Sequence, residues 1–273
     1  MRILMLLCSL YCSTAFAQAP ATQPVVRCAV INGMMLVDFW PKLAERFEKE
    51  TGIHVDTVAF GEKAIIDEAF RDGGIDLITM HASDKIINLV ADGWASDPQP
   101  WCRNELVIIG PPDDPAGISG MTNAGKALRK LADSPVPLVV HSSLGAQGVL
   151  RAIVDEEEVS FDPQKITMLF DDQQRQVLEI AAQKGAYTMI GRIPFLIGRI
   201  PNHGMKLMVQ GDPRLRRPYV VAVANPAKVP DARIQLANRL KAFLREKTTQ
   251  QWIGQFGAGT YDARPLFFPV EVP

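Results

Sequence analysis

The chain has 273 residues, of which 47% are hydrophobic and 22% are charged, with 29 Lys and Arg against 30 Asp and Glu. This near-neutral balance excludes the basic face that nucleic acid or an anionic membrane surface would need, so no nucleic-acid partner is expected. The length allows a sizeable core in one or two domains.

The first 17 residues have the three parts of a secretory signal. Arg2 precedes a long apolar run, and Ala15-Phe16-Ala17 matches a small-residue cleavage site. The run is too short for a permanent membrane-spanning helix. We therefore expect residues 1–17 to be removed and the mature chain to be a periplasmic monomer. Loss of Arg2 leaves 28 basic against 30 acidic residues, a net charge of about −2.

Export would leave two of the four cysteines, Cys28 and Cys102. In an oxidising compartment such a pair can form a disulfide, and two buried free thiols are the alternative. The four histidines lie at positions 54, 81, 141 and 203, without the spacing of metal ligands. The sequence therefore predicts no metal site and no cofactor.

Apolar runs of strand length alternate with amphipathic helical patterns along the chain. The predicted strands are 26–31, 54–60, 75–81, 105–110, 136–140, 166–170, 186–190, 205–210 and 219–224. The predicted helices are 34–50, 63–72, 84–92, 123–132, 147–154, 173–184 and one or two within 230–256. Pro41 is expected to kink or break the first of these helices. This alternation predicts an α/β fold with mostly parallel sheets flanked by helices.

The segment 104–118 predicts a change of lobe. A buried strand is followed by Pro111, Pro112 and Pro115, which lack amide donors, and by turn-forming Asp and Gly. The run 219–224, followed by Asn225-Pro226, has the same form. Two such crossings predict a two-lobed protein with a cleft, in which residues 26–109 and 222–273 form the first lobe and 110–221 the second.

Ligands of open parallel sheets bind beyond the carboxyl ends of the strands, where helix N-termini point. Two loops at such positions are the main candidates for ligand binding. The first contains Asn32, Gly33 and Met34, and the second contains His141, Ser142, Ser143 and Gln147. Helix capping is the alternative role for the serines, and a packed histidine is the alternative for His141.

Neighbouring strand ends supply further candidates. Gly61 precedes Glu62 and Lys63, His81 ends the third strand, and Arg192 follows the strand 186–190. Arg192 suits an oxyanion because guanidinium pairs well with one, and a surface ion pair is the alternative. Three further arginines, at 214, 216 and 217, precede the return crossing and are expected to be mostly solvated.

His141 beside Ser142 also raises the possibility of an exported hydrolase. Adjacent residues on an extended stretch point to opposite faces, so the two are poorly placed as base and nucleophile. The sequence contains no G-x-S-x-G elbow and no Walker-type phosphate loop. We expect no catalytic residue and no enzymatic activity, and we keep a hydrolase that uses the His141 loop as the alternative.

An ordered series of segments resembles the substrate-binding proteins of tungstate-type ABC transporters, a branch of the periplasmic type II binding-protein fold. The segments cover nearly all of the mature chain and read FEKETGI (47–53), IDLITMHA (75–82), NELVIIGPPDDPAGI (104–118), QKGAYTMIGR (183–192), QGDPRLRRPYVVAVANPAKVP (210–230) and PLFFP (265–269). The resemblance implies an exported protein that presents a small anion or polar solute to a membrane permease. A sensor or accessory subunit is the alternative within this class.

The resemblance also shows which ligand groups are exchanged. The family's Thr/Ser-rich first loop reads Val30 to Met34 here, and His141 stands where the family has an arginine, whereas Arg192 is retained. A neutral imidazole cannot supply the permanent charge or the bidentate fork of a guanidinium. The exchanges therefore argue against tungstate or molybdate and favour a ligand with an organic part, such as a small carboxylate.

Overall fold

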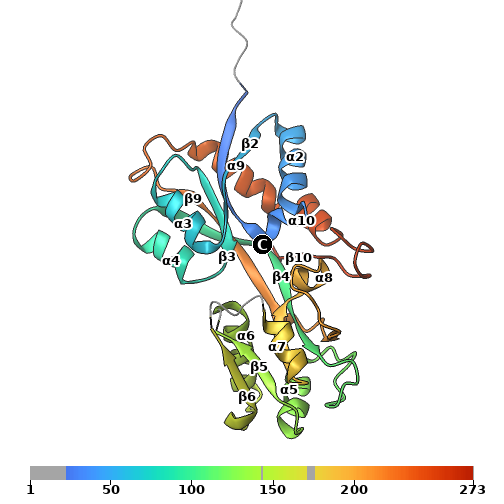
Figure 1. Cartoon of the computed structure of the whole chain (residues 1–273). Helices are drawn as coiled ribbons and strands as arrows, with labels where there is room; N and C mark the ends of the chain where they lie inside the picture. The colour runs from blue at the N-terminus through green and yellow to red at the C-terminus, as the bar shows by residue number, and fades with distance from the viewer. Residues whose placement is uncertain (1–22, 143, 171–175, 273) are drawn as a thin grey trace, which may run out of the picture.

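The computed structural model of the chain describes residues 23–142, 144–170 and 176–272. The predicted signal sequence and Ser143 lie outside these residues. Two bodies of the structure are joined by a narrower middle, and we call them the upper and lower halves as they stand in Figure 1.

The upper half is built on the sheet order β2-β1-β3-β9-β4, in which β1, β2 and β3 are parallel and β9 is antiparallel to its neighbours. Its strands are β1 (Val25–Ile31), β2 (His54–Gly61), β3 (Leu77–His81), the first part of β4 (Ala95–Gly110), β9 (Arg216–Ala224) and β10 (Phe268–Pro269). Its helices are α1 (Asn32–Met35), α2 (Phe39–Thr51), α3 (Lys63–Arg71), α4 (Asp84–Ala91), α9 (Ile234–Arg245) and α10 (Lys247–Ile253).

The lower half continues the same sheet from β4 through β7 and β5 to β6, with β8 paired to β4. Its further strands are β5 (Leu138–His141), β6 (Ile166–Leu169), β7 (Tyr187–Gly191) and β8 (Lys206–Val209). Its helices are α5 (Ala124–Asp133), α6 (Leu144–Glu156) and α7 (Val177–Gln183), with α8 (Arg192–Leu196) near the middle and 3-10 turns at Pro163–Lys165 and Pro213–Leu215. The predicted α/β class with helix-flanked, mostly parallel strands is confirmed.

Two long strands connect the halves. β4 pairs with β9 as far as Glu105 and then pairs with β7 from Leu106 onward, so it changes partner within two residues. β9 lies antiparallel to β4 and carries the chain back to the upper half. The middle of the molecule therefore consists of paired strands, and successive side chains along each strand point to opposite faces of the sheet.

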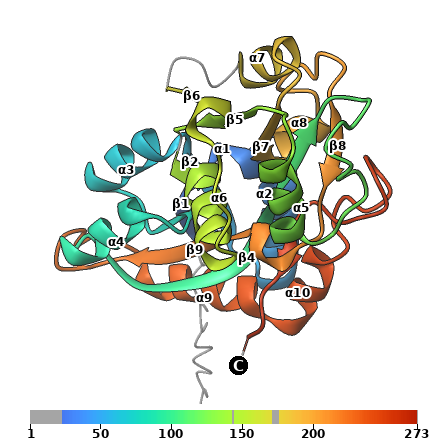
Figure 2. The ribbon, with the colours of Figure 1, turned by 90° about the horizontal axis from the view of Figure 1, so that it is seen from below.

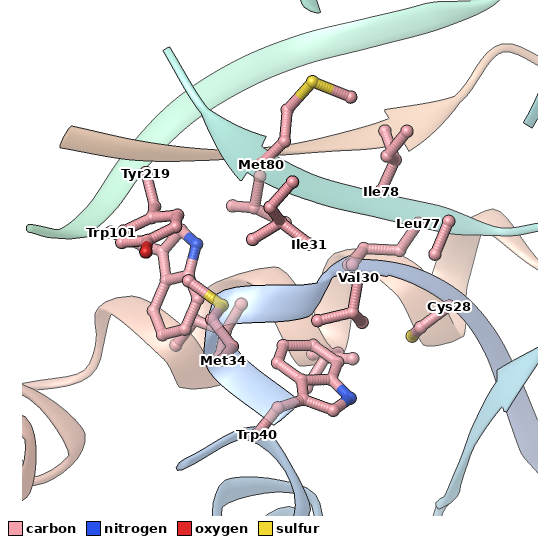
Figure 3. Packing of buried hydrophobic residues seen from close by; sticks show 14 of the residues in the cluster. Cys28, Val30, Ile31, Met34, Trp40, Leu77, Ile78, Met80, Trp101 and Tyr219 are labelled. Carbon is pink, nitrogen blue, oxygen red and sulfur yellow. The ribbon is translucent and has the colours of Figure 1, made fainter. Parts of the chain in front are cut away.

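The upper core is apolar and rich in aromatic side chains. Phe39, Trp40 and Trp101 are at most 1% exposed, and the Phe39 ring stacks on Phe267 with centroids 3.8 Å apart. Figure 3 shows Trp101 packed beside Met34 and Tyr219. Full burial of one such side chain contributes about 1.5–3 kcal/mol. This packing holds the ends of β1 and β3 in fixed positions.

The second part of β4 is buried on both faces. Leu106 and Ile108 belong to one core cluster of the lower half, and Val107 and Ile109 belong to the other. This alternation follows from the two-residue period of a strand. At the end of β4 an added Cβ on Gly110 would lie 2.3 Å from the Tyr187 ring, so only glycine fits there.

Two expected boundaries were wrong. The first helix is divided before Pro41, at Asp38, whose φ of 56° interrupts the helical backbone. Pro41 lies in the first turn of α2, where no amide donor is needed. β4 begins at Ala95, ten residues before the predicted start at 105. The strand accommodates Pro98 and Pro100 because both coincide with register shifts against β9.

The possible disulfide is also absent. Cys28 and Cys102 are both free and both buried, as in the alternative of two packed thiols. Burial raises the pKa of each thiol well above its usual value. Within the described part of the chain, every helix is too short or too polar to cross a lipid bilayer.

Candidate functional site

One face of the crossing strands gathers polar side chains from three neighbouring strands. His81 at the end of β3 is the register partner of Tyr219 on β9, and Asn104 on β4 is the register partner of Arg217 on β9. Directly opposed residues, and residues two apart on one strand, share a face. We call His81, Asn104, Arg217 and Tyr219 the crossing cluster.

The aromatic rings of His81 and Tyr219 pack against each other within this cluster. Their rings stack with centroids 4.1 Å apart and an interplanar angle of 29°. Tyr219 is 1% exposed, and its hydroxyl lies 3.7 Å from the position that a Cβ on Gly33 would take. The predicted loop residue Gly33 therefore borders the cluster through Tyr219, whereas Asn32 begins α1 and Met34 is fully buried in the upper core.

Arg217 carries a positive charge with no acidic partner among the residues that the structure describes. Burial lowers the pKa of its guanidinium, and among the described residues no acidic side chain forms an ion pair with it or raises that pKa. An added Cβ on Gly145 would lie 2.3 Å from the Arg217 Cζ, so the guanidinium packs against the start of α6. A helix N-terminus is itself partly positive. A cation and a positive helix end thus meet where the two halves approach.

Lys63 adds a second cation. It is the first residue of α3 and follows Gly61, a buried glycine at the end of β2. Burial lowers the pKa of Lys63, Arg217 lowers it further, and Asp84 and Glu62 oppose the change. Lys63 is therefore close enough to Arg217 to be affected by its charge while keeping acidic neighbours of its own.

The electrostatic surroundings keep His81 neutral. Burial holds the pKa of His81 well below its ordinary value, Arg217 and Lys63 lower it further, and Asn104 opposes them. The Nε2 atom of His81 and the Oδ1 atom of Asn104 are buried, and neither has a hydrogen-bond partner among the described residues. The cluster therefore combines fixed cations with neutral polar atoms that lack partners.

The second predicted loop is only partly brought to this place. His141 is 5% exposed, and its Nε2 atom lies 3.0 Å from the backbone oxygen of Phe170. The Ser142 amide donates to the Leu169 oxygen at 2.8 Å, and Gln147 lies half-buried in the second turn of α6. Ser143 falls outside the described residues. Among these loop residues it is Gly145, absent from the predicted set, that contacts the crossing cluster.

Arg192 lies in a different environment, on the side of Glu105 and Arg216. It is fully buried, its Nε donates to Gln210 at 3.1 Å, its Nη1 donates to the Pro265 oxygen at 2.8 Å, and its Nη2 pairs with Asp262. Glu105 lies 3.9 Å from Arg192 and 3.0 Å from Arg264. We call this group of Glu105, Arg192, Gln210, Asp262 and Arg264 the rear cluster. The Arg192 guanidinium is occupied by protein acceptors.

The sequence prediction missed Lys63, Asn104, Arg217 and Tyr219 as site residues. The expectation that the arginines at 214, 216 and 217 are mostly solvated was wrong, since all three are at least half-buried. Arg214 pairs with Asp212 at 2.8 Å and Glu157 at 2.7 Å, and burial lowers the pKa of Arg216 and Arg217. The alternation Arg217, Tyr219 on a crossing strand was the signal available in the sequence.

The geometry defines a class of protein. Two α/β halves, joined by crossing strands and meeting at a desolvated cation, form the architecture of a two-lobed solute-binding protein. No cluster of three or more potential metal ligands occurs among the residues that the structure describes.

The chain belongs to the family of bacterial extracellular solute-binding proteins, whose model matches residues 33–258. A candidate anion-binding protein of an ABC transporter from Haloferax volcanii is 31% identical over 233 residues, which are 82% of this chain and 65% of that relative. The chain thus spans less than two thirds of that relative's length. The tungstate-binding protein TupA of Peptoclostridium acidaminophilum is 24% identical over 230 residues, covering 83% of this chain and 79% of the relative.

Solved structures agree with these matches. A tungstate-binding protein, TupA, from Desulfovibrio alaskensis has a TM-score of 0.74 and 28% identity, covering 91% of this chain and all of that one. The tungstate ABC transporter structure from Geobacter sulfurreducens has a TM-score of 0.67 at 23% identity, covering 85% of this chain and 98% of that one, and supports the fold. The resemblance to tungstate-type substrate-binding proteins and the type II binding-protein fold are confirmed.

Proposed function

We propose that this protein is the periplasmic solute-binding component of an ABC-type uptake system and that it binds a small anion between its two lobes. The family membership and the two relatives named for anion and tungstate binding support this proposal. The lobes would comprise residues 26–109 with 222–273 and residues 110–221. The loaded protein would present the anion to a membrane permease.

The observation that carries the proposal is the state of Arg217. A half-buried cation that has lost most of its water and has no paired acid is unfavourable, and proteins rarely retain one unless something neutralises it. Arg217, on the crossing strand β9, also faces the start of α6, so two positive groups repel each other at this point. An anion placed between them would reverse the sign of both interactions. Anion binding would thereby favour the closed arrangement of the lobes.

The first test is thermal unfolding of the mature protein with tungstate, molybdate, sulfate, phosphate and small carboxylates. A ligand that binds only the native state raises stability by RT ln(1 + [L]/Kd), about 2.7 kcal/mol at a hundredfold excess over Kd. We expect at least one anion to raise the melting temperature and Arg217→Met to remove most of that increase. An increase unchanged by Arg217→Met would contradict the proposed site.

Two glycines of α6 provide a matched pair of variants. An added Cβ on Gly145 would displace the Arg217 guanidinium, whereas an added Cβ on Gly148 meets no atom within 4 Å. Each change replaces a helical glycine, which by itself stabilises a helix by about 0.5–1 kcal/mol. We expect Gly145→Ala to weaken anion binding and Gly148→Ala to leave it unchanged. Equal affinities for the two variants would count against the Arg217 contact.

The sensor and hydrolase alternatives make different predictions for the same protein. A sensor would bind the anion without a requirement for a permease, and transport of the anion would survive deletion of the protein. A hydrolase would turn over ester or phosphate substrates and lose that turnover in His141→Ala. We place the hydrolase behind the uptake proposal because the charge of Arg217 is explained by binding alone, and we place the sensor behind it because a relative is named as an anion-binding protein of an ABC transporter.

A further inference from the structure

The crossing cluster contains two buried polar side-chain atoms that no donor or acceptor of the described residues reaches. The buried His81 Nε2 and Asn104 Oδ1 atoms have no partner among the described residues, and Asn104 is 7% exposed. A buried polar atom left without a hydrogen bond destabilises a protein by about 1–3 kcal/mol. The Asn104 oxygen raises the pKa of His81, so the two groups are neighbours, yet they do not reach hydrogen-bond geometry.

The Asn104 Oδ1 atom needs a donor in either tautomer of the His81 ring. A neutral imidazole has one N–H donor and one acceptor nitrogen, and the amide oxygen of Asn104 is a further acceptor. In the Nδ1–H tautomer the His81 Nε2 atom is an acceptor, and in the Nε2–H tautomer it is a donor, whereas the Asn104 Oδ1 atom is an acceptor in both. Arg217 and Lys63 are donors only, and neither donates to His81 or Asn104 in the part of the chain that the structure describes.

The charges of the two cations also differ. Lys63 has Asp84 and Glu62 nearby, and both support its charged form. Arg217 has no such acid among the described residues. One uncompensated positive charge suits an anion with a single negative charge, and the planar guanidinium suits a carboxylate or a phosphate bidentately.

We propose that the ligand is a monoanion that carries its own hydrogen-bond donor, such as a hydroxyl, which donates to the Asn104 Oδ1 atom and accepts from the His81 Nε2 atom while Arg217 binds the anionic group. This inference rests on the proposed function and narrows its ligand. Hydroxycarboxylates and protonated oxyanions share this chemistry. An oxoanion without a proton would neutralise Arg217 but leave the Asn104 Oδ1 atom unsatisfied.

Isothermal titration of the mature protein with matched probes tests the inference. Lactate and propionate have the same carbon skeleton and charge and differ in one hydroxyl, whereas phosphate and sulfate differ in bound protons. We expect lactate to bind at least tenfold more tightly than propionate, or phosphate at least tenfold more tightly than sulfate. A preference for lactate over propionate indicates a hydroxycarboxylate ligand, and a preference for phosphate over sulfate indicates a protonated oxyanion.

Variants assign the preference to its residues. Asn104→Leu keeps the side-chain volume without polar atoms, and His81→Phe keeps the ring on Tyr219 without nitrogens. Either variant should reduce the preference to less than threefold while the aprotic probe keeps its affinity. Arg103→Ala, at the exposed neighbouring position of β4, is the control and should keep the full preference. If one variant does not fold, the other still decides.

The failures are distinguishable. If no anion binds, the proposed function itself fails. If propionate and sulfate bind as tightly as lactate and phosphate, or if the preference survives both Asn104→Leu and His81→Phe, the protein binds anions and only the donor inference is overturned.

Discussion

The crossing strands have two faces, and among the described residues their buried arginines are paired with acids on one face only. On the rear face, Arg192 and Arg264 share the fully buried carboxylate of Glu105, and Asp262 pairs with Arg192 as well. On the other face, Arg217 has no acidic partner among the described residues. The preceding residue, Arg216, is the register partner of Glu105 and lies beside the rear cluster. β4 and β9 therefore carry paired charges on one face and, on the other, a cation without an acidic partner among the described residues.

This difference separates stability from function. A buried charge that is paired and hydrogen-bonded leaves no net charge to attract a ligand. Such a group can hold the C-terminal segment against the crossing strands. An unpaired one destabilises the empty protein and is relieved when an anion arrives. The rear cluster is thus a joint, and the crossing cluster is a site that is completed by its ligand.

The largest expected effect comes from removing the shared carboxylate of the joint. Glu105→Ala leaves Arg192 and Arg264 without it and removes the acceptor of the Gly211 amide, which donates at 2.9 Å. Breaking a buried charge network in this way destabilises by about 3–5 kcal/mol. Urea unfolding measures the loss, with exposed Glu62→Ala as the control. A loss no larger than that of the control would remove the contrast between the two faces.

The next effect is a pH dependence of the ligand-free protein. Burial and two cations lower the pKa of His81 in the folded state, whereas the unfolded residue titrates near 6.5. Below pH 6.5 the unfolded chain binds a proton that the folded chain does not, so stability falls as the pH falls. The slope for one such group reaches about 1.4 kcal/mol per pH unit.

Urea unfolding between pH 7.5 and 5 measures this slope. His81→Phe should flatten the profile. A parent profile that His81→Phe does not alter would mean that the pKa of His81 is the same in the folded and unfolded chain, and the neutral side of the crossing cluster would be wrong.

The sequence predicts the fold well because strand and helix patterns are local. Alternating elements and the prolines after Gly110 are enough to indicate parallel sheets and a crossing. The start of β4 was missed because Pro98 and Pro100 argue against a strand, and only its partner β9 shows that they coincide with register shifts.

The site is harder to predict because it depends on distant pairing. His81 follows a strand end and is found from the sequence, but Asn104 and Arg217 become neighbours only through a register that joins residues more than a hundred positions apart. Arg192 was predicted as a ligand residue for its charge, and its acids at 105 and 262 are equally distant in the chain. Sequence patterns show which residues are charged, and pairing shows which charges are neutralised.

A smaller effect of the opposite sign is expected for Arg217→Met in the ligand-free protein. Methionine keeps the apolar part of the side chain and removes a desolvated cation that repels Lys63 and the start of α6. Replacing a poorly compensated buried charge in this way stabilises by about 1 kcal/mol. Thermal unfolding at low salt measures the gain. Destabilisation by more than about 1 kcal/mol would show that Arg217 has partners like those of the rear cluster.

The smallest effect concerns Cys102, which shares the face of the crossing cluster as the register partner of Tyr219. Because Cys28 and Cys102 are free and buried with raised thiol pKa values, reducing agent should leave the melting temperature unchanged. A disulfide would typically contribute about 2–4 kcal/mol, a shift that the same measurement would detect. Thiol labelling should modify both cysteines of the mature chain after unfolding and neither before it. Labelling of Cys102 in the native protein would mean that the crossing strands open, and the low dielectric on which the unbalanced charge of Arg217 depends would be lost.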